Sequence, residues 1–336
     1  MADGVLPMPV PATIEVDDNL SSDFENLSAE AQSGTTSICS SVTRYRLENG
    51  RRYHAYRDGA YFLPNDKREQ ERMELQHRIY RRLLDGRLYL APLTSSPSRV
   101  LDLGTGTGCW AVDFADQHPS SQVFGNDLSP IQRTWMPPNC TFDVDDFESE
   151  WPYDQSRRFD YIHARDIAGS VGDYDKLFER AYQNLNPGGY LELQDFEIDI
   201  FSDDESRERA VTAVQWQRIL AYSSEKFGKP LMVAKEWKEK MIRAGFTDVV
   251  VEIFKIPLAP WAKDPSLREL GSMQARHMDE VLESYSRALF TRIMEWSTEE
   301  LDLLLAGVRT DLANPTARLY GKIWVVYGRK PEPLDN

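Results

Sequence analysis

A glycine-rich loop after an apolar run constrains the fold of this chain more than any other feature. The stretch Val-Leu-Asp-Leu-Gly-Thr-Gly-Thr-Gly-Cys-Trp at 100–110 places Gly104, Gly106 and Gly108 between that run and a helical pattern. Without Cβ atoms the backbone can turn sharply and a ligand can approach it, while free N–H groups at a helix start favour a carboxylate or phosphate. The loop therefore predicts a nucleotide-like ligand at a strand end.

Short apolar runs alternate with helical patterns around this loop. The runs cover 99–103, 122–126, 140–144, 159–163, 190–194, 247–254 and 319–327; helices are expected at about 66–85, from 108 and 174, and at 205–227, 235–243, 265–295 and 297–312. Strands alternating with helices at this pitch form parallel sheets covered on both faces. We therefore predict an α/β, Rossmann-like fold: a seven-stranded, mostly parallel sheet with an inserted helical lid.

The chain divides into a tail and one domain. Residues 1–43 carry seven acidic and no basic side chains and are rich in Ser, Thr and Pro, so we expect a disordered acidic tail. Its role is either a solubilising spacer or a partner-binding arm. The domain is expected at 44–330, with a helical preface at 44–97, a ligand-binding core at 98–196, and lid helices with the last strands at 197–330.

Charge and cysteine content narrow the function classes. The net charge is −15, with no dominant cluster of Lys and Arg, which argues against direct binding of nucleic acid. Three cysteines without C-x-x-C spacing signal neither a disulfide framework nor a zinc site. No apolar stretch is long enough to span a membrane, and no secretory leader is recognised. We expect a cytosolic or nuclear protein.

The spacing of acidic residues after the loop selects the ligand. The loop reads G-x-G-x-G after Asp102, so the dinucleotide fingerprint is not met, and no P-loop motif is present. The second predicted strand ends at Asp127, whose carboxylate suits the two hydroxyls of an unphosphorylated ribose. Asp146 and Phe147 end the next strand, where an adenine would lie. The alternatives are a helix-capping acid at 127 and an acidic surface turn at 146–147.

These motifs, together with Asn-Pro-Gly-Gly at 186–189, resemble the class I S-adenosylmethionine-dependent methyltransferases. More narrowly, Tyr-His-Ala-Tyr at 53–56, Tyr-Phe-Leu-Pro-Asn-Asp at 61–66, Asp-Leu-Ser-Pro-Ile-Gln at 127–132, Ala-Gly-Ser at 168–170, Leu-Gln-Asp at 193–195 and Val-Tyr-Gly-Arg-Lys at 326–330 resemble the fungal LaeA-like methyltransferases. The resemblance covers about 44–330. Its subfamily motifs do not specify a substrate, because members include metabolite methyltransferases and regulators of secondary metabolism and development.

The resemblance implies S-adenosyl-L-methionine as cofactor. The three glycines would line its methionine part, Asp127 would hold the ribose, and Asp146 with Phe147 the adenine. Asp102 would orient the loop or meet the cofactor's amino group. The end of the fourth strand, 162–165, passes under the methionine part of the cofactor in this fold, which makes His163 and Arg165 candidates for contact with it. The alternative for both is packing and salt bridges at the sheet edge. The implied cofactor-binding residues are Asp102, Gly104, Gly106, Gly108, Asp127, Leu128, Asp146, Phe147 and Arg165.

Methyl transfer needs alignment more than a strong catalytic group, because the cofactor carries the activation. An acceptor that loses a proton requires a base, and histidine is the commonest choice. Of five histidines only His163 falls at a carboxyl strand end. Asp195, after the fifth strand, and Tyr61, in the preface, are further candidates. No histidine pair has metal-ligand spacing with a carboxylate, so no metal is expected.

The leading hypothesis is a methyltransferase acting on an oxygen or nitrogen atom of a small-molecule secondary metabolite. The alternative is a LaeA-like regulatory protein that acts on or with protein partners. A third possibility is a protein that keeps the cofactor but catalyses another reaction, since fold does not fix function. No membrane partner is expected, and hetero- or homo-oligomers stay open.

Overall fold

A computed structural model describes residues 45–54, 56–57, 59–93, 96–154 and 156–333. The acidic tail predicted at 1–43 lies outside them. Seven strands form one sheet in the order β5-β4-β3-β6-β7-β9-β8. The strands are β3 (Arg99–Leu103), β4 (Gln122–Asp127), β5 (Cys140–Val144), β6 (Phe159–Arg165), β7 (Leu185–Phe201), β8 (Thr247–Pro257) and β9 (Tyr320–Arg329).

Strand direction confirms the predicted mostly parallel sheet. β3 pairs in parallel with β4 and β6, β4 with β5, and β6 with β7. Only β9 is reversed: it runs antiparallel to β7 and to β8. The carboxyl ends of β3, β4, β5 and β6 therefore meet at one edge of the sheet, where the predicted site residues follow the strands.

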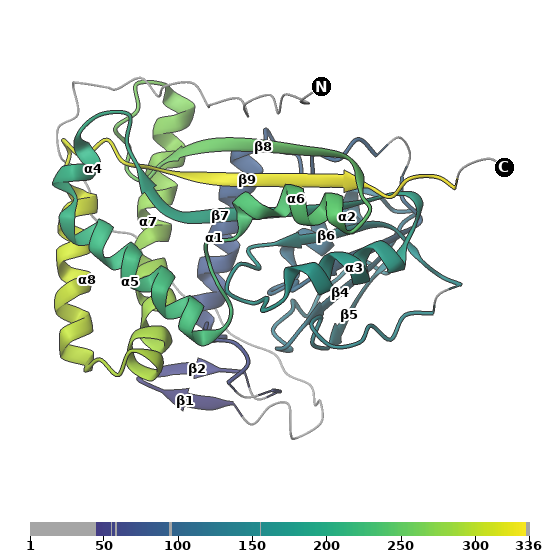
Figure 1. Ribbon diagram of the computed structural model, residues 1–336, viewed down its shortest axis with the longest axis horizontal. Coiled ribbons are helices and arrows are strands. Elements are labelled where there is room, and N and C mark those ends of the chain that lie inside the picture. Colours follow the sequence, from purple (N-terminus) through teal and green to yellow (C-terminus); the bar gives the residue numbers. More distant parts are fainter. Residues whose placement is uncertain (1–44, 55, 58, 94–95, 155, 334–336) are drawn as a thin grey trace, which may run out of the picture.

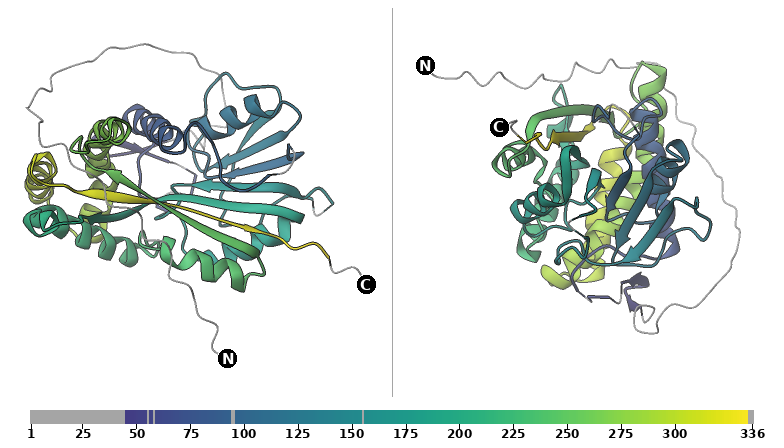
Figure 2. Two further views of the ribbon diagram at one scale, coloured as in Figure 1. Left: turned by 90° about the horizontal axis from the view of Figure 1, so that it is seen from above. Right: turned by 90° about the vertical axis from the view of Figure 1, so that its right-hand side faces the viewer.

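Helices cover both faces of the sheet (Figure 1). On one face lie α3 (Tyr174–Asn184) and α6 (Trp237–Arg243), the latter preceded by a 3-10 turn at Ala234–Glu236. On the other lie α1 (Lys67–Leu83), α2 (Cys109–Gln117) and α7 (Pro265–Ala288). Ile79 and Tyr80 of α1 are buried with Ile323 and Val325 of β9. Figure 2 shows α1 and α7 side by side. Because both faces are buried, the strands read as apolar runs in the sequence.

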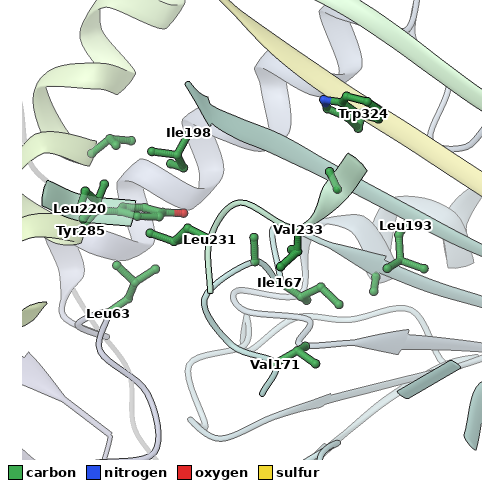
Figure 3. Close-up of a cluster of buried hydrophobic side chains, with 14 of the residues drawn as sticks. Leu63, Ile167, Val171, Leu193, Ile198, Leu220, Leu231, Val233, Tyr285 and Trp324 are labelled. Carbon is green, nitrogen blue, oxygen red and sulfur yellow. The ribbon is translucent and has the colours of Figure 1, made fainter. Parts of the chain in front are cut away.

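The lid comes from segments that extend beyond the sheet. β7 runs for 17 residues and leads into α4 (Ser206–Arg209) and α5 (Val211–Phe227). After α7, a π-helical turn at Leu289–Ile293 precedes α8 (Thr298–Ala313), which packs on α5. Leu220 of α5 and Tyr285 of α7 share one buried cluster with Leu63 and Leu231 (Figure 3). This cluster joins the lid to the N-terminal segment.

The N-terminal segment begins with a hairpin of β1 (Arg46–Glu48) and β2 (Arg51–Tyr53). Arg51 of β2 binds the carboxylate of Asp66 with a 2.7 Å Nε–Oδ2 distance. Asp66 also caps α1 by accepting a hydrogen bond from the backbone N–H of Glu69. These contacts fix where α1 starts, and α1 then crosses the carboxyl edge of the sheet. No helix in the described part of the chain is long and apolar enough to cross a membrane.

Candidate functional site

A cleft lies at the carboxyl edge of the sheet and has two adjoining parts. The first part, of about 710 Å³, is lined by the glycine loop together with side chains of α1, α7 and the end of β6. The second part, of about 470 Å³, is lined by residues that follow β4, β5 and β6. Both volumes include space open to solvent. Tyr61, Gly104, Asp127 and Asp166 line both parts, so the two parts form one continuous site.

Two glycines of the loop shape the floor of the cleft. Gly104 and Gly106 both line it, with φ values of +63° and +57° that disfavour any side chain. A Cβ on Gly104 would lie 3.3 Å from the Phe147 ring, and one on Gly106 would lie 3.2 Å from Sδ of Met73. The missing side chains therefore leave the space that a ligand would fill.

The third glycine has a different role. Gly108 is not among the residues that line the cleft. It precedes α2 with φ of +78°, and a Cβ there would lie 2.6 Å from Cζ of Phe142 on β5. Gly108 thus allows α2 to pack closely on the sheet, which is one established role of the third glycine in such loops.

Asp127 lies where the sequence predicts a sugar-binding acid. Its Oδ2 accepts a hydrogen bond from Gly106 N–H and its Oδ1 from Ser129 N–H, each at 2.9 Å. Burial raises the pKa of Asp127 to about 6, although both backbone bonds act to lower it. A carboxylate has roughly four acceptor positions. Two of them therefore stay available for ligand hydroxyls.

The second part of the cleft contains the other predicted pair. Asp146 and Phe147 line it together with Leu128. Asp146 is engaged by the exposed Arg57, with 3.2 Å between Nε and Oδ2. The Phe147 ring is buried beside Gly104. The arrangement offers a carboxylate and an aromatic ring to a flat heterocycle.

His163 and Asp102 lie beneath the cleft and line neither part of it. His163 has no exposed surface, donates from Nδ1 to Oδ1 of Asp102 at 2.7 Å, and stacks on Trp110 of α2 with 3.7 Å between ring centroids. Burial lowers the pKa of His163, so the ring is neutral. Asp102 also accepts a hydrogen bond from Thr105 Oγ1. The structure therefore places His163 beneath the glycine loop and outside both parts of the cleft, where it supports the loop through Asp102.

Asp195 is buried behind the cleft wall, where its Oδ2 accepts a hydrogen bond from Ala168 N–H at 2.8 Å. Its neighbour Asp166 lines both parts of the cleft and adopts φ of +55°, a strained value for a residue other than glycine. Burial raises the pKa of both carboxyl groups, and that of Asp195 is raised further by Asp166. Two other residues predicted from the sequence as site residues, Tyr61 and Arg165, line the cleft.

Sequence reasoning misses Asp166 and three side chains from distant segments: Arg72, Met73 and Tyr285, all of which line the cleft. Asp166 directly follows Arg165, so its position at a strand end was a usable signal. Arg72 lies three residues after Glu69 on the buried face of α1, a spacing typical of an internal ion pair. Nothing in the sequence marks Tyr285. Within the described residues, no group of three or more His, Cys, Asp or Glu side chains could hold a metal ion.

Comparison with known proteins agrees with this geometry. A family model described as a methyltransferase domain matches residues 75–251, more than half of the chain. The methyltransferase pytC of Aspergillus terreus is 38% identical over 325 residues, which cover 96% of this chain and 100% of that protein. The secondary metabolism regulator laeA of Aspergillus fumigatus is 34% identical over 288 residues, or 84% and 76% of the two chains.

Among solved structures, phosphoethanolamine N-methyltransferase 2 of Haemonchus contortus in complex with S-adenosyl-L-methionine is 21% identical, with a TM-score of 0.42 over 77% of this chain and 53% of that one. The family model and the two fungal relatives are enough to confirm the resemblance predicted from the motifs. The chain therefore belongs to the methyltransferase-domain family.

Proposed function

We propose that this chain transfers the methyl group of S-adenosylmethionine to an oxygen or nitrogen atom of a small-molecule secondary metabolite. The observation that carries the proposal is that one cleft combines the glycine loop, the buried Asp127 carboxylate, and the Asp146–Phe147 pair. The family match gives the reaction class, and the cleft gives a place for the methyl donor.

The residues present fit the cofactor. Gly104 and Gly106 leave space that a Cβ would fill, and Asp127 keeps acceptor positions that two ribose hydroxyls would occupy. Asp146 and Phe147, with Leu128, would hold the adenine in the second part of the cleft. When bound, the cofactor supplies an activated methyl group on its sulfonium.

The chain's own contribution is alignment and exclusion of water. Tyr61 lines both parts of the cleft, and burial holds the pKa of its hydroxyl above the usual value. That hydroxyl stays protonated, so it would orient an acceptor as a hydrogen-bond donor. His163, outside the cleft, would hold Asp102 and through it Thr105 of the loop.

Acceptor class is the point on which enzyme and regulator differ. The match to the methyltransferase pytC spans the whole of that protein, whereas the match to the regulator laeA leaves about a quarter of it uncovered. This difference supports a metabolite acceptor. The regulatory alternative, a protein acting on or with protein partners, is supported by the laeA match itself. Residues 44–330 would form the catalytic unit, in the cytosol or nucleus, where the free Cys109 and Cys140 stay reduced.

Two experiments test the proposal. Saturating S-adenosylmethionine should raise the melting temperature, since a ligand at 100 times its Kd stabilises by about 2.7 kcal/mol. Asp127→Ala or Gly106→Val should abolish that shift, and an unchanged wild-type melting temperature would refute cofactor binding. Labelled S-adenosylmethionine, incubated with a host extract split into protein and metabolite pools, should then label metabolites. Label confined to proteins would favour the regulatory alternative.

A further inference from the structure

The outer face of the lid, formed by α5 and α8, carries large apolar side chains that are open to solvent. Three of the exposed large apolar side chains in the described part of the chain lie here: Val211 (66% exposed) and Tyr222 (52%) on α5, and Leu303 (77%) on α8. Single exposed apolar residues are normal, whereas a group of them on one face indicates an interaction site. Figure 1 shows both helices at the left end of the molecule, away from β4 and β5.

A groove runs along this face beside α5. It has a volume of about 1370 Å³, including space open to solvent, and its lining includes Glu208 of α4 together with Val211, Val214, Gln215 and Arg218 of α5. The α5 residues recur every three or four positions, so they share one side of the helix. The groove is therefore a strip along a helix, a shape that suits another helix better than a small molecule.

α8 widens this face on the flank of α5 that carries Thr212. Gly307 of α8 lies against that residue, and a Cβ on Gly307 would lie 2.7 Å from Thr212 Cγ2. Leu303 is one helical turn before Gly307, so it lies on the same side of α8 and borders the α5 strip. Arg309 of α8 is ion-paired with Glu283 of α7, with 2.9 Å between Nη2 and Oε1. The face is therefore a preformed surface.

The groove carries one free charge of each sign. Glu208 precedes the start of α5 and Arg218 lies near its middle, and both side chains are exposed. Neither forms an ion pair with another described residue. The two other charged residues of the groove, Asp204 and Arg207, are already paired within the chain. An acid, an apolar strip that includes Val211 and a base thus follow one another along the helix, so an occupant must present a base to the acid and an acid to the base.

We propose that this face is the interface of a homodimer, in which α5 packs antiparallel on α5 of a second copy across a two-fold axis. Every contact in such an interface occurs twice. With the axis beside Val211 and Val214, Glu208 faces Arg218 of the partner subunit, and the reverse pair forms on the other side. The exposed Val211 then lies at the centre, where buried apolar contacts contribute most to binding. This inference goes beyond the proposed function and does not rest on it.

Charge favours a second copy over the chain's own acidic segment as the occupant. Residues 1–43 carry seven acidic and no basic side chains, so they offer no opposite charge to Glu208. A second copy supplies both an acid and a base, and symmetry places them opposite the base and the acid of the first. The same packing covers Val211, which would otherwise stay in water.

Sedimentation velocity of the full chain over a concentration series tests the interface. The wild type should shift from the monomer mass towards twice that mass as the concentration rises. Val211→Glu puts a charge at the centre of the interface in both copies, so it should raise the Kd of the dimer at least about tenfold. Ile242→Glu is the matched control: Ile242 is an apolar residue of α6, 51% exposed, outside this face. The control should change the Kd by less than about twofold.

Charge reversals test the orientation of the two helices. Glu208→Arg and Arg218→Glu each create two like-charge pairs across the axis, so each should raise the Kd of the dimer at least about tenfold. The double variant Glu208→Arg/Arg218→Glu restores both pairs with the charges exchanged, so its Kd should return to within about threefold of the wild-type value. Melting curves check that each variant folds.

Each outcome decides for or against the dimer interface. A reversible wild-type dimer that is weakened by Val211→Glu and by each single reversal, and restored by the double reversal, supports the proposal. A wild type that stays monomeric at every concentration overturns it. A dimer that Val211→Glu leaves intact overturns it as well, because the contact then lies elsewhere on the molecule. Weakening by Val211→Glu without the expected effects of reversal and rescue overturns the antiparallel arrangement.

Discussion

The affinity of this protein for its cofactor should fall at mildly acidic pH because of Asp127. Burial raises the pKa of this carboxyl group from 3.8 to about 6 in the ligand-free protein. An ionised carboxylate accepts hydrogen bonds from both ribose hydroxyls, whereas a protonated one turns one oxygen into a donor. Binding therefore selects the ionised form, and protonation competes with the ligand.

The size of the effect follows from that pKa. Asp127 is roughly 97% ionised at about pH 7.5 and roughly 9% ionised at about pH 5. The Kd for S-adenosylhomocysteine should therefore rise about tenfold between these values, or about 1.4 kcal/mol. The free energy of unfolding of the ligand-free protein should change in the opposite direction to the affinity, and rise as the pH falls. Because the folded-state pKa lies above the unfolded value, the folded protein binds the proton more tightly, so the contribution of Asp127 to stability rises as pH falls from about 6 towards about 4.

Titration calorimetry at several pH values measures this affinity. Asp127→Asn cannot titrate, so its weaker binding should lose the tenfold pH dependence, whereas Asp146→Asn should bind weakly and keep it. A wild-type Kd that is constant from about pH 7.5 to about pH 5 would refute the reasoning. So would a full pH dependence in Asp127→Asn, because other groups would then be responsible.

Three further substitutions test packing and roles. Gly108→Ala should lower the free energy of unfolding by about 3 kcal/mol, since a positive φ and a Cβ 2.6 Å from the Phe142 ring both oppose it. Adding Phe142→Leu should relieve only the steric part of this loss, so strictly additive effects of the two substitutions on the unfolding free energy in urea would contradict that contact. His163→Asn should lower the melting temperature yet keep kcat within about tenfold, because its imidazole holds Asp102 outside the cleft; a thousandfold loss of kcat in a folded variant would instead identify a general base. Ser297→Ala should cost about 1 kcal/mol by removing the capping box of α8, and an unchanged urea midpoint would argue against that cap.

The sequence alone predicts the sheet well because strands covered on both faces appear as apolar runs between helical patterns. The runs expected at 99–103 and 140–144 coincide with β3 and β5, and the runs at 159–163 and 190–194 lie within the longer β6 and β7. The extra length of β7 was missed. Its first residues pair with β6 through a register shift at the Asn-Pro-Gly-Gly segment, where Gly188 has φ of +78°. Where a strand such as β7 begins and ends depends on its pairing with distant segments, and local sequence patterns do not encode that pairing.

The cofactor side of the cleft was also predictable, because its residues follow consecutive parallel strands. Strand ends that are spaced along the chain meet at one edge, so Gly104, Asp127 and Asp146 come together for a topological reason. The opposite wall was not predictable. Arg72 and Tyr285 reach the cleft from α1 and α7, which are distant in sequence and meet it only through tertiary packing.

His163 shows most clearly what the sequence alone does not predict. Its position at a strand end can be predicted, but a strand buried on both faces has no alternation of apolar and polar residues to show where each side chain points. Sheet register pairs His163 with Asp102, and the Trp110 ring of α2 covers that face. The sequence therefore determined the strands, the loop and the acids at the sheet edge. Only the tertiary structure decided which side chains face the ligand, because that choice depends on register and on the helices packed against each face.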